Sequence, residues 1–414
     1  MLNRGLLLAS GKAGGNQTIG EAGGQGFGVG VYGGDSADLD AMGLAPMDGC
    51  DDPSSDNYGN YRHSNGSVMV FIPAFCYRVG NAAAPSYSRD NANALEIRDA
   101  ALGEGDGWVL HRAFIDGGVQ KLGFFIDKYI CSKDSTGKLA ISVKNGDNIS
   151  LSTDYVNSST MPNCSGQVFD AIPLSRARGE GFSLTTGFQW SAIAMLSLAH
   201  GQAATSSQFC GWYDAKHEKN YPKGNNSWRH DCDDSSVTWT AHVANPSIGK
   251  TGSGTPFVKT THNGQACGVT DVNGSQWQAV LGFSNPSEKT YRVFKDNVKA
   301  HDITKNNVVN DSLYATISAS SEDSTSYYWG ANAFYRDASG INRALCGLIP
   351  YIRQGSENNL FGRDTFYVDR ENYSVLLVAG DCTRGTVAGV WTRSCGSWGS
   401  NGWAKSFRAA GYAS

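Results

Sequence analysis

The chain has 414 residues, of which 40% are hydrophobic, 11% aromatic and only 17% charged. This apolar content is ample for a core and excludes global disorder, while a net charge of -4 without a basic run argues against a nucleic-acid-binding footprint. The longest apolar stretches, such as 68–75 and 374–379, are far too short to span a membrane, so we expect no membrane insertion.

Residues 1–65 are rich in Gly, Asp and Asn and show little helical or strand periodicity. They predict an N-terminal arm, an attachment segment or an irregular cap. The opening MLNRGLLLAS has an apolar run too short for a signal peptide, so we expect an unprocessed chain. Gly28–Gly33 matches G-x-G-x-x-G, but the broken sequence after it cannot supply the helix of a dinucleotide site. A glycine-rich loop is the favoured interpretation.

From Val68 onwards the pattern changes to strands and one helix. Residues 68–80 and 122–133 are rich in β-branched and aromatic residues, as strands are. Thr186 and Gln189 form a capping box that predicts a helix from about Thr186 to His200, ended by Gly201.

The following stretch, 202–365, is polar and turn-rich and predicts loop-rich insertions. Within it, Asn273-Gly274 is a tight-turn dipeptide that leads into a strand at Gln276. The stretch TFYVDRENYSVLLVAGD, residues 365–381, leads from another strand pair into the C-terminal segment.

The ten cysteines include no C-x-x-C pair, which excludes a zinc ribbon or a thioredoxin-like site. Several, including Cys76 and Cys131, sit in apolar patterns, so buried thiols are expected, although the even count leaves disulfides open. The cluster at 230–234, HDCDD, lacks a second ligand pair and predicts a solvated polar turn. We therefore expect no metal and no cofactor.

Five motifs in order resemble the formylglycine-generating-enzyme-like branch of the C-type lectin fold. They are Met69-Val70 with Ile72-Pro73, Phe124 with Ile126-Asp127-Lys128-Tyr129, Ser183-Leu184 with Thr186 and Gln189-Trp190, Asn273-Gly274 with Gln276-Trp277-Gln278, and Ala379–Cys382 with Ser406-Phe407-Arg408. The resemblance implies an α+β, C-type lectin-like fold of the formylglycine-generating (sulfatase-modifying) type over residues 66–414, with a mostly antiparallel sheet and loop-rich insertions.

The enzymes of that branch hold copper with a closely spaced cysteine pair near the C-terminus. Cys382 and Cys395 lie in the matching segment, but their spacing and flanking residues differ, and Arg384 and Arg393 are the cations next to them in sequence. We expect no catalytic residue, and keep a copper-dependent, cysteine-oxidising enzyme as the alternative. The calcium-lectin signatures E-P-N, Q-P-D and W-N-D are absent from the sequence.

The C-terminal run also resembles the variable region, here about 380–408, of proteins diversified by retroelements. In that family adenines in a template are randomised, mostly in Asn codons, which cannot become Trp, Lys, Glu, Gln or Met. Trp391, Trp398, Trp403 and Lys405 are therefore expected to be fixed. The positions expected to be replaceable are Asp381, Thr383, Arg384, Val387, Thr392, Ser394, Gly396, Ser397, Gly399, Ser400, Gly402 and Ala404.

Together with Trp391, Arg393 and Trp398, these positions are the candidate ligand-binding residues. We leave Trp391 open between core and contact. Seven polar positions are expected to form one exposed patch above Phe407 and Trp403: Asp381, Thr383, Arg384, Thr392, Ser394, Ser397 and Ser400. The resemblance implies a hypervariable receptor-binding protein, either a phage tail-tip adhesin or a bacterial surface-displayed lectin-like protein. Implied partners are a host cell-surface protein or glycan, tail proteins at the N-terminal arm, and further copies of the chain, a trimer being preferred. The implied location is the virion or a cell surface.

Overall fold

The computed structural model describes residues 18–161, 163–217, 222, 225–227, 229–284, 290–318, 326–336, 340–356, 359–367 and 374–413. The expectation about the start of the chain falls on residues 1–17, outside this part. The expected α+β class is confirmed, with strands far outnumbering helices. The α-helices are α1 (Ser36–Ala41), α2 (Tyr87–Asp90), α3 (Ala171–Arg176), α4 (Gly187–Ala203) and α5 (Ile341–Leu345). No helix in the described ranges is long and apolar enough to cross a membrane.

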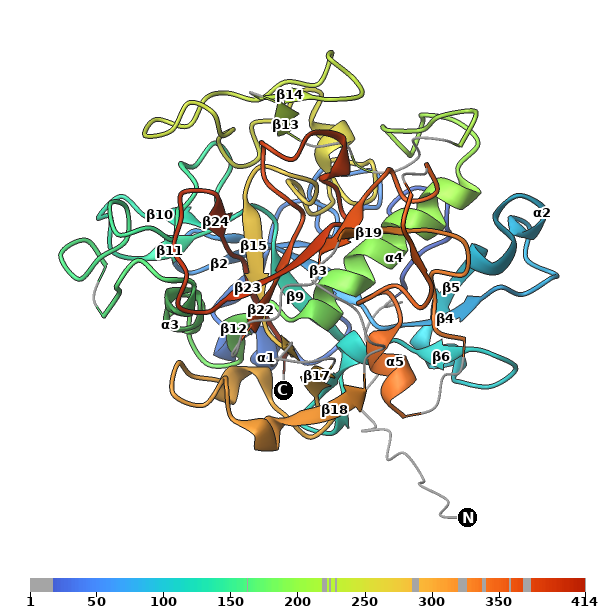
Figure 1. The fold of residues 1–414 in the computed structure, drawn as a ribbon, viewed down its shortest axis with the longest axis horizontal. Helices are drawn as coiled ribbons and strands as arrows, with labels where there is room; N and C mark the ends of the chain where they lie inside the picture. The colour runs from blue at the N-terminus through green and yellow to red at the C-terminus, as the bar shows by residue number, and fades with distance from the viewer. Residues whose placement is uncertain are drawn as a thin grey trace.

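Two large sheets dominate the architecture (Figure 1). The first has the order β1 (Leu44–Pro46), β2 (Asn60–His63), β3 (Val68–Pro73), β9 (Gly123–Asp127), β25 (Ala409–Gly411) and β12 (Phe182–Leu184). The second has the order β20 (Arg353–Gln354), β19 (Ser326–Trp329), β21 (Thr365–Tyr367), β23 (Arg393–Ser397), β22 (Ser374–Val378), β15 (Trp277–Val280) and β24 (Lys405–Ser406). Most neighbouring strands are antiparallel, and the β15–β24 and β21–β23 pairs are parallel.

Smaller sheets and hairpins surround these two. They are β5 (Leu95–Asp99) with β4 (Phe75–Val79) and β6 (Val109–Leu110); β16 (Phe283–Ser284) with β17 (Thr290–Phe294) and β18 (Tyr314–Ser318); β7 (Ile115–Asp116) with β8 (Val119–Gln120); β10 (Ser132–Lys133) with β11 (Ala140–Ile141); and β13 (Asn225–Ser227) with β14 (His230–Asp231).

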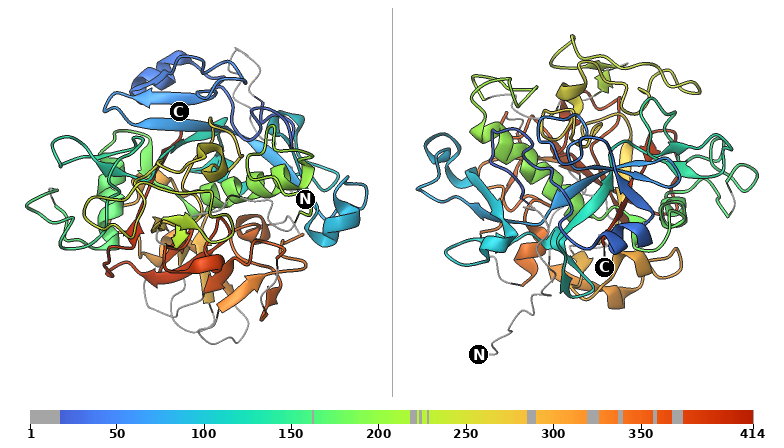
Figure 2. Two further views of the ribbon diagram at one scale, coloured as in Figure 1. Left: turned by 90° about the horizontal axis from the view of Figure 1, so that it is seen from above. Right: turned by 180° about the vertical axis from the view of Figure 1, so that it is seen from behind.

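Helix α4 lies between the two large sheets, as the left view of Figure 2 shows. It is buried on every side from Gly187 to Gly201, which explains why its sequence is apolar all round. The predicted capping box is confirmed: the Gln189 amide donates to Thr186 Oγ1 at 3.1 Å, and the Thr186 amide donates to Gln189 Oε1 at 2.8 Å. Gly201 was wrongly expected to end the helix. It stays helical because it is packed inside, and the turn closes at Ala204, whose amide donates to the His200 carbonyl.

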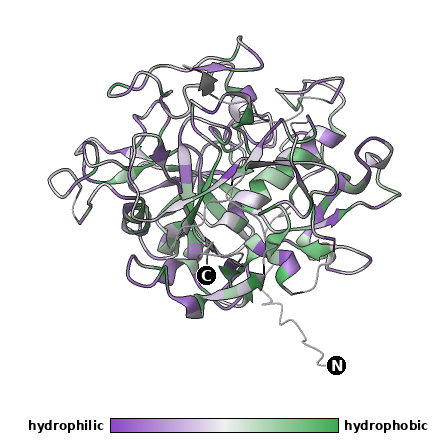
Figure 3. Ribbon diagram, viewed as in Figure 1, coloured by the Kyte–Doolittle hydropathy of each residue, from purple (hydrophilic) through white to green (hydrophobic). Residues whose placement is uncertain are grey.

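Residues 18–65 are built into the same unit as the rest of the chain. Strands β2 and β3 pair across the expected boundary at residue 65, with Asn60 opposite Val70. Phe27 and Val29, in the glycine-rich loop region, are fully buried, and one continuous apolar core runs from Ile19 to Tyr412. The hydrophobic strands and α4 lie centrally and the polar loops outside (Figure 3). An attachment role for the N-terminal region stays a prediction.

Candidate functional site

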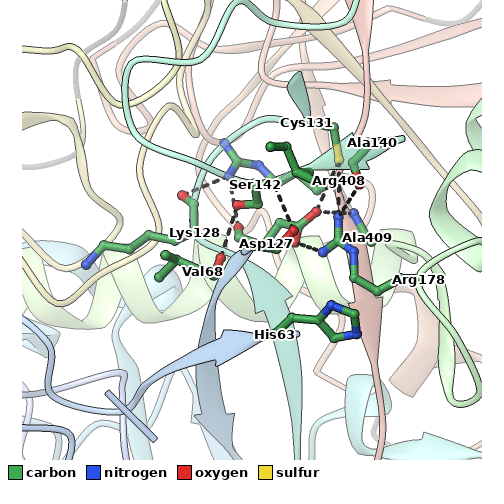
Figure 4. A network of polar contacts seen from close by, with 12 residues as sticks. His63, Val68, Asp127, Lys128, Cys131, Ala140, Ser142, Arg178, Arg408 and Ala409 are labelled. Carbon is green, nitrogen blue, oxygen red and sulfur yellow. Dashed lines mark hydrogen bonds and ion pairs between the residues drawn. The ribbon is translucent and has the colours of Figure 1, made fainter. Parts of the chain in front are cut away.

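A buried polar network fixes the chain at the end of the C-terminal segment (Figure 4). Asp127, at the end of β9, is ion-paired with Arg178 and accepts hydrogen bonds from the Ala409 amide at 2.8 Å and the Cys131 thiol at 3.2 Å. Both charged side chains of the ion pair are completely buried. Because the Asp127 carboxylate holds the first residue of β25, it sets where the preceding segment returns to the core.

Arg408 closes the same network with neutral acceptors. Its guanidinium donates to the carbonyl oxygens of Asp127 and Lys128, both at 3.0 Å, and to Gln278 Oε1 at 2.6 Å. Arg408 is 1% exposed, and burial lowers its pKa to about 10. Three motifs that are far apart in sequence, those at 127, 278 and 408, therefore meet in space.

Two of the three tryptophans in the C-terminal segment anchor it to the core. Trp391 is completely buried, and its ring centroid lies 4.9 Å from that of Trp329 and 5.1 Å from that of Phe361. Trp398 is 1% exposed and stacks on Phe169 with centroids 5.6 Å apart. The role of Trp391 was left open between core packing and ligand contact, and the structure shows core packing.

Trp403 is the exception and corrects an expectation. It was expected beneath the surface, but 39% of the residue is exposed. The backbone at this position is what holds the chain: its carbonyl accepts from Gln276 Nε2 at 2.6 Å and from Ser150 Oγ at 3.0 Å. With the carbonyl turned inward, the indole ring faces outward. Phe407, four residues later, is fully buried as expected.

Three candidate polar residues turn out to be structural. Arg393 is fully buried, donates to the Val390 carbonyl at 2.6 Å, and has its pKa lowered to about 9 by burial. Asp381, 6% exposed, accepts from the Thr383 amide at 2.8 Å, and Thr392, 1% exposed, donates to the Val387 carbonyl. Short polar side chains often satisfy nearby backbone groups in this way. The expectation that Asp381 and Thr392 belong to an exposed patch is therefore wrong.

The other replaceable positions all reach the surface. Successive residues of β23 face opposite sides of the sheet. Arg393 and Cys395 point inward, whereas Ser394 and Gly396 are partly exposed. Arg384 is exposed, with its guanidinium 5.6 Å from the ring centroid of Trp277. The partly or fully exposed candidates are Thr383, Arg384, Val387, Ser394, Gly396, Ser397, Gly399, Ser400, Gly402 and Ala404.

The loop between β22 and β23 is fixed by a contact from outside the segment. The Trp391 amide donates to Asp364 Oδ2 at 2.7 Å. A Cβ atom at Gly389 would lie 2.1 Å from Asp364 Oδ1, far closer than any real contact, so any other residue there would force the Asp364 carboxylate to move. Asp364 and strand β19 lie in the stretch where we expected loop-rich insertions, and sequence reasoning did not single them out. The aromatic run at 327–329 was the available signal for β19.

The two cysteines of the segment are both buried, and burial raises the pKa of the Cys382 thiol to about 11. A thiol with a raised pKa is a poor nucleophile and metal ligand at neutral pH. The 230–234 cluster is an ordered turn, in which Asp231 Oδ1 accepts from the amides of Asp233 and Asp234 at 2.7 and 3.0 Å. Within the described ranges, no group of three or more His, Cys, Asp or Glu residues is arranged to hold a metal ion.

The site is thus a surface segment carried on a rigid α+β scaffold. No protein-family model matches the chain, and no curated protein matches it. Among solved structures it is similar to the U1 and M1 variants of Major Tropism Determinant, at 10% and 11% identity and TM-scores of 0.31 and 0.32. These matches cover 84% of this chain and 63% of those chains. It is also similar to PvdO from Pseudomonas aeruginosa, at 11% identity and a TM-score of 0.27, over 85% of this chain and 97% of that one.

Proposed function

We propose that this chain is a hypervariable binding protein whose C-terminal segment is diversified by a retroelement and recognises a host-cell surface receptor, as a phage tail-tip adhesin does. The observation that carries the proposal is the division of burial between 381 and 404. Trp391 and Trp398, which a randomised Asn codon cannot produce, are buried anchors, whereas Trp403, the third such tryptophan, is exposed. All but two of the replaceable positions are at least partly exposed.

This division has an energetic reason. Replacing a large core side chain commonly costs about 2–5 kcal/mol, whereas surface substitutions usually stay within about 0.5 kcal/mol. A segment whose sequence changes repeatedly must keep its changes at the surface, because a protein has only about 5–15 kcal/mol of stability in total. The fixed anchors and the buried carboxylate of Asp364 preserve the backbone while the exposed side chains change.

A binding role suits the chemistry of the segment better than catalysis. The alternative, a copper-dependent cysteine-oxidising enzyme, needs thiolates, and burial of Cys382 opposes thiolate formation. We expect the C382S/C395S variant to keep its ligand binding. Stoichiometric copper in the purified protein that is lost in this double variant would favour the enzyme instead.

Two further parts of the proposal concern assembly. The chain forms a symmetric homo-oligomer, with a trimer preferred, and its N-terminal region attaches it to other tail proteins. Several copies of a weak site then bind a cell surface tightly through effective concentration. A surface-displayed lectin-like protein is the second candidate, and it shares the same variable site.

The DNA beside the gene tests the retroelement directly. We expect a reverse-transcriptase gene and a near-repeat of the region encoding 380–408. The two copies should differ where the repeat has adenine, at the codons of exposed residues such as Ser394 and Ser397, and should agree at Trp391 and Trp398. A neighbourhood without such a repeat, or differences concentrated at the tryptophan codons, would contradict the proposal.

A further inference from the structure

Three adjacent strands of the second sheet join the variable segment to the stretch 326–367. Strand β19 pairs with β21, placing Tyr328 opposite Thr365, and β21 pairs with β23, placing Tyr367 opposite Ser394. Residues directly opposite in a sheet project to the same face, as do residues two apart in one strand. Six partly exposed residues on one side of these strands are here named the tyrosine face: Tyr328, Gln354, Thr365, Tyr367, Ser394 and Gly396.

The tyrosine face is partly exposed over β19, β20, β21 and β23. Beyond β23 the same side of the sheet is covered, because Leu377 and Val375 of β22, opposite Ser394 and Gly396, are buried. Each of its six residues is partly exposed. The opposite side carries Trp329, Phe366 and Arg393, all buried to 1% or less, and the Arg393 guanidinium lies 5.8 Å from the Trp329 ring centroid. Strand β23 runs across the front of the molecule, on the side of α4 away from the first sheet (Figures 1 and 2).

The composition of the face is that of a protein-binding surface. None of its six residues is charged. Tyrosine supplies a large, amphipathic contact area at low cost in conformational entropy, and Ser, Thr, Gly and amide side chains supply adaptable contacts. On strands, both tyrosines are held more rigidly than they would be on loops.

We propose that the tyrosine face is a constant part of the ligand-binding surface and that it docks an uncharged patch of a folded protein. This rests on the proposed function. Tyr328 and Tyr367 supply binding energy common to all variants, while Ser394 and Gly396, in the same face, supply the choice between partners.

The shape of the face favours a protein over a small saccharide. Ligand sites for small molecules are concave, whereas the tyrosine face is a pleated surface spread over four strands. A cleft of about 260 Å³ does exist, but its walls include Tyr77, Arg78 and Arg336, beside β4 and β6, and none of the six face residues lines it.

The test uses the full chain displayed on yeast. Thr383, Arg384, Ser394, Ser397 and Ser400 are randomised together, and binders are selected in parallel against streptavidin, a folded protein, and dextran, a neutral polysaccharide. Each selected binder then receives Y328S/Y367S, Y328F/Y367F or, as a matched control, Y351S. Tyr351 is 54% exposed and lies outside the face. Melting temperatures of all variants show whether each one folds.

We expect streptavidin binders whose affinity falls at least tenfold with Y328S/Y367S, stays within about threefold with Y328F/Y367F, and is unchanged by Y351S. Unchanged affinity in folded Y328S/Y367S variants, or binders against dextran alone, would overturn the tyrosine face. The two proposals fail separately. Suppose that a binder keeps its affinity when the parental residues at 383–400 are restored, but loses it with Y328S/Y367S. This result contradicts the variable site and supports the tyrosine face. A library without binders contradicts both.

Discussion

At the residue scale, the tryptophans of the C-terminal segment divide into anchors and a surface residue. Trp398 stacks on Phe169, and its carbonyl accepts a hydrogen bond from the Phe169 amide at 3.1 Å. Both the side chain and the backbone of Trp398 therefore hold the segment to the core. Trp403 contributes mainly its carbonyl, which any residue would provide. The same side chain thus has a different energetic role at two positions five residues apart.

This difference predicts unequal costs for the same substitution. Trp398→Ala leaves a cavity beside Phe169 and should lower the free energy of unfolding by about 3–5 kcal/mol. Trp403→Ala should lower it by less than about 1 kcal/mol, because the ring is already partly in water. Urea unfolding of both variants checks the prediction, and equal losses would contradict the assignment of Trp398 as an anchor.

Asp364 and Gly389 predict an energetic coupling. Gly389→Ala places a methyl group against the Asp364 carboxylate and should cost about 1–3 kcal/mol. Asp364→Ala should also destabilise, because the Trp391 amide loses its acceptor. In the double variant the clash is absent. Its loss of unfolding free energy should therefore be smaller than the sum of the losses in the two single variants. Additive losses in unfolding experiments would show that the two residues act independently.

At the element scale, the sequence predicted best the elements with strong local signals. Thr186 and Gln189 define the start of α4, and the apolar runs define β3, β9 and β15, because capping and side-chain alternation are local properties. It failed for β19, whose short aromatic run is stabilised by pairing with β21, a strand more than thirty residues away. The same limit applied to Arg393 and Thr392, since burial of a polar side chain depends on distant packing partners.

The N-terminal region shows how a segment without periodicity is held. His200 Nδ1 accepts from the Gly23 amide at 3.1 Å, and the His200 ring stacks on Phe27 with centroids 5.3 Å apart. The His262 ring contacts the Gly28 carbonyl at 3.3 Å. Burial lowers the pKa of His200 to about 4 and that of His262 to about 3, so both rings are neutral in the folded protein.

These histidines predict a loss of stability in mild acid. Below the unfolded pKa of about 6.5 the unfolded chain takes up protons that the folded chain does not, so the free energy of unfolding falls as the pH falls toward 4. Between pH 7 and pH 5, His200 alone should account for about 2 kcal/mol. Urea unfolding at both pH values checks this, and His200→Gln should reduce the pH dependence by that amount. An unchanged pH dependence in the variant would contradict the neutral, buried ring.

At the scale of the whole molecule, the fold separates what must stay constant from what can change. The Asp127–Arg178 pair and Arg408 fix one end of the segment, and β22, buried along its whole length, fixes the other. Between these ends the exposed side chains contribute little to the core. Stability and recognition are therefore carried by different residues of the same segment.

This separation predicts that many surface changes cost less than one buried change. The variant T383Y/S394Y/S397Y/S400Y alters four positions that are exposed or partly exposed, so its free energy of unfolding should stay within about 1–2 kcal/mol of the parent. Thr392→Tyr, a single change at a residue 1% exposed, forces a ring into a filled site and removes the hydroxyl bonded to Val387. It should cost more than the four surface changes together, about 1–3 kcal/mol from overpacking plus the lost hydrogen bond. Unfolding of both variants under identical conditions decides the matter, and a quadruple variant less stable than Thr392→Tyr would mean that the exposed positions are not free to vary.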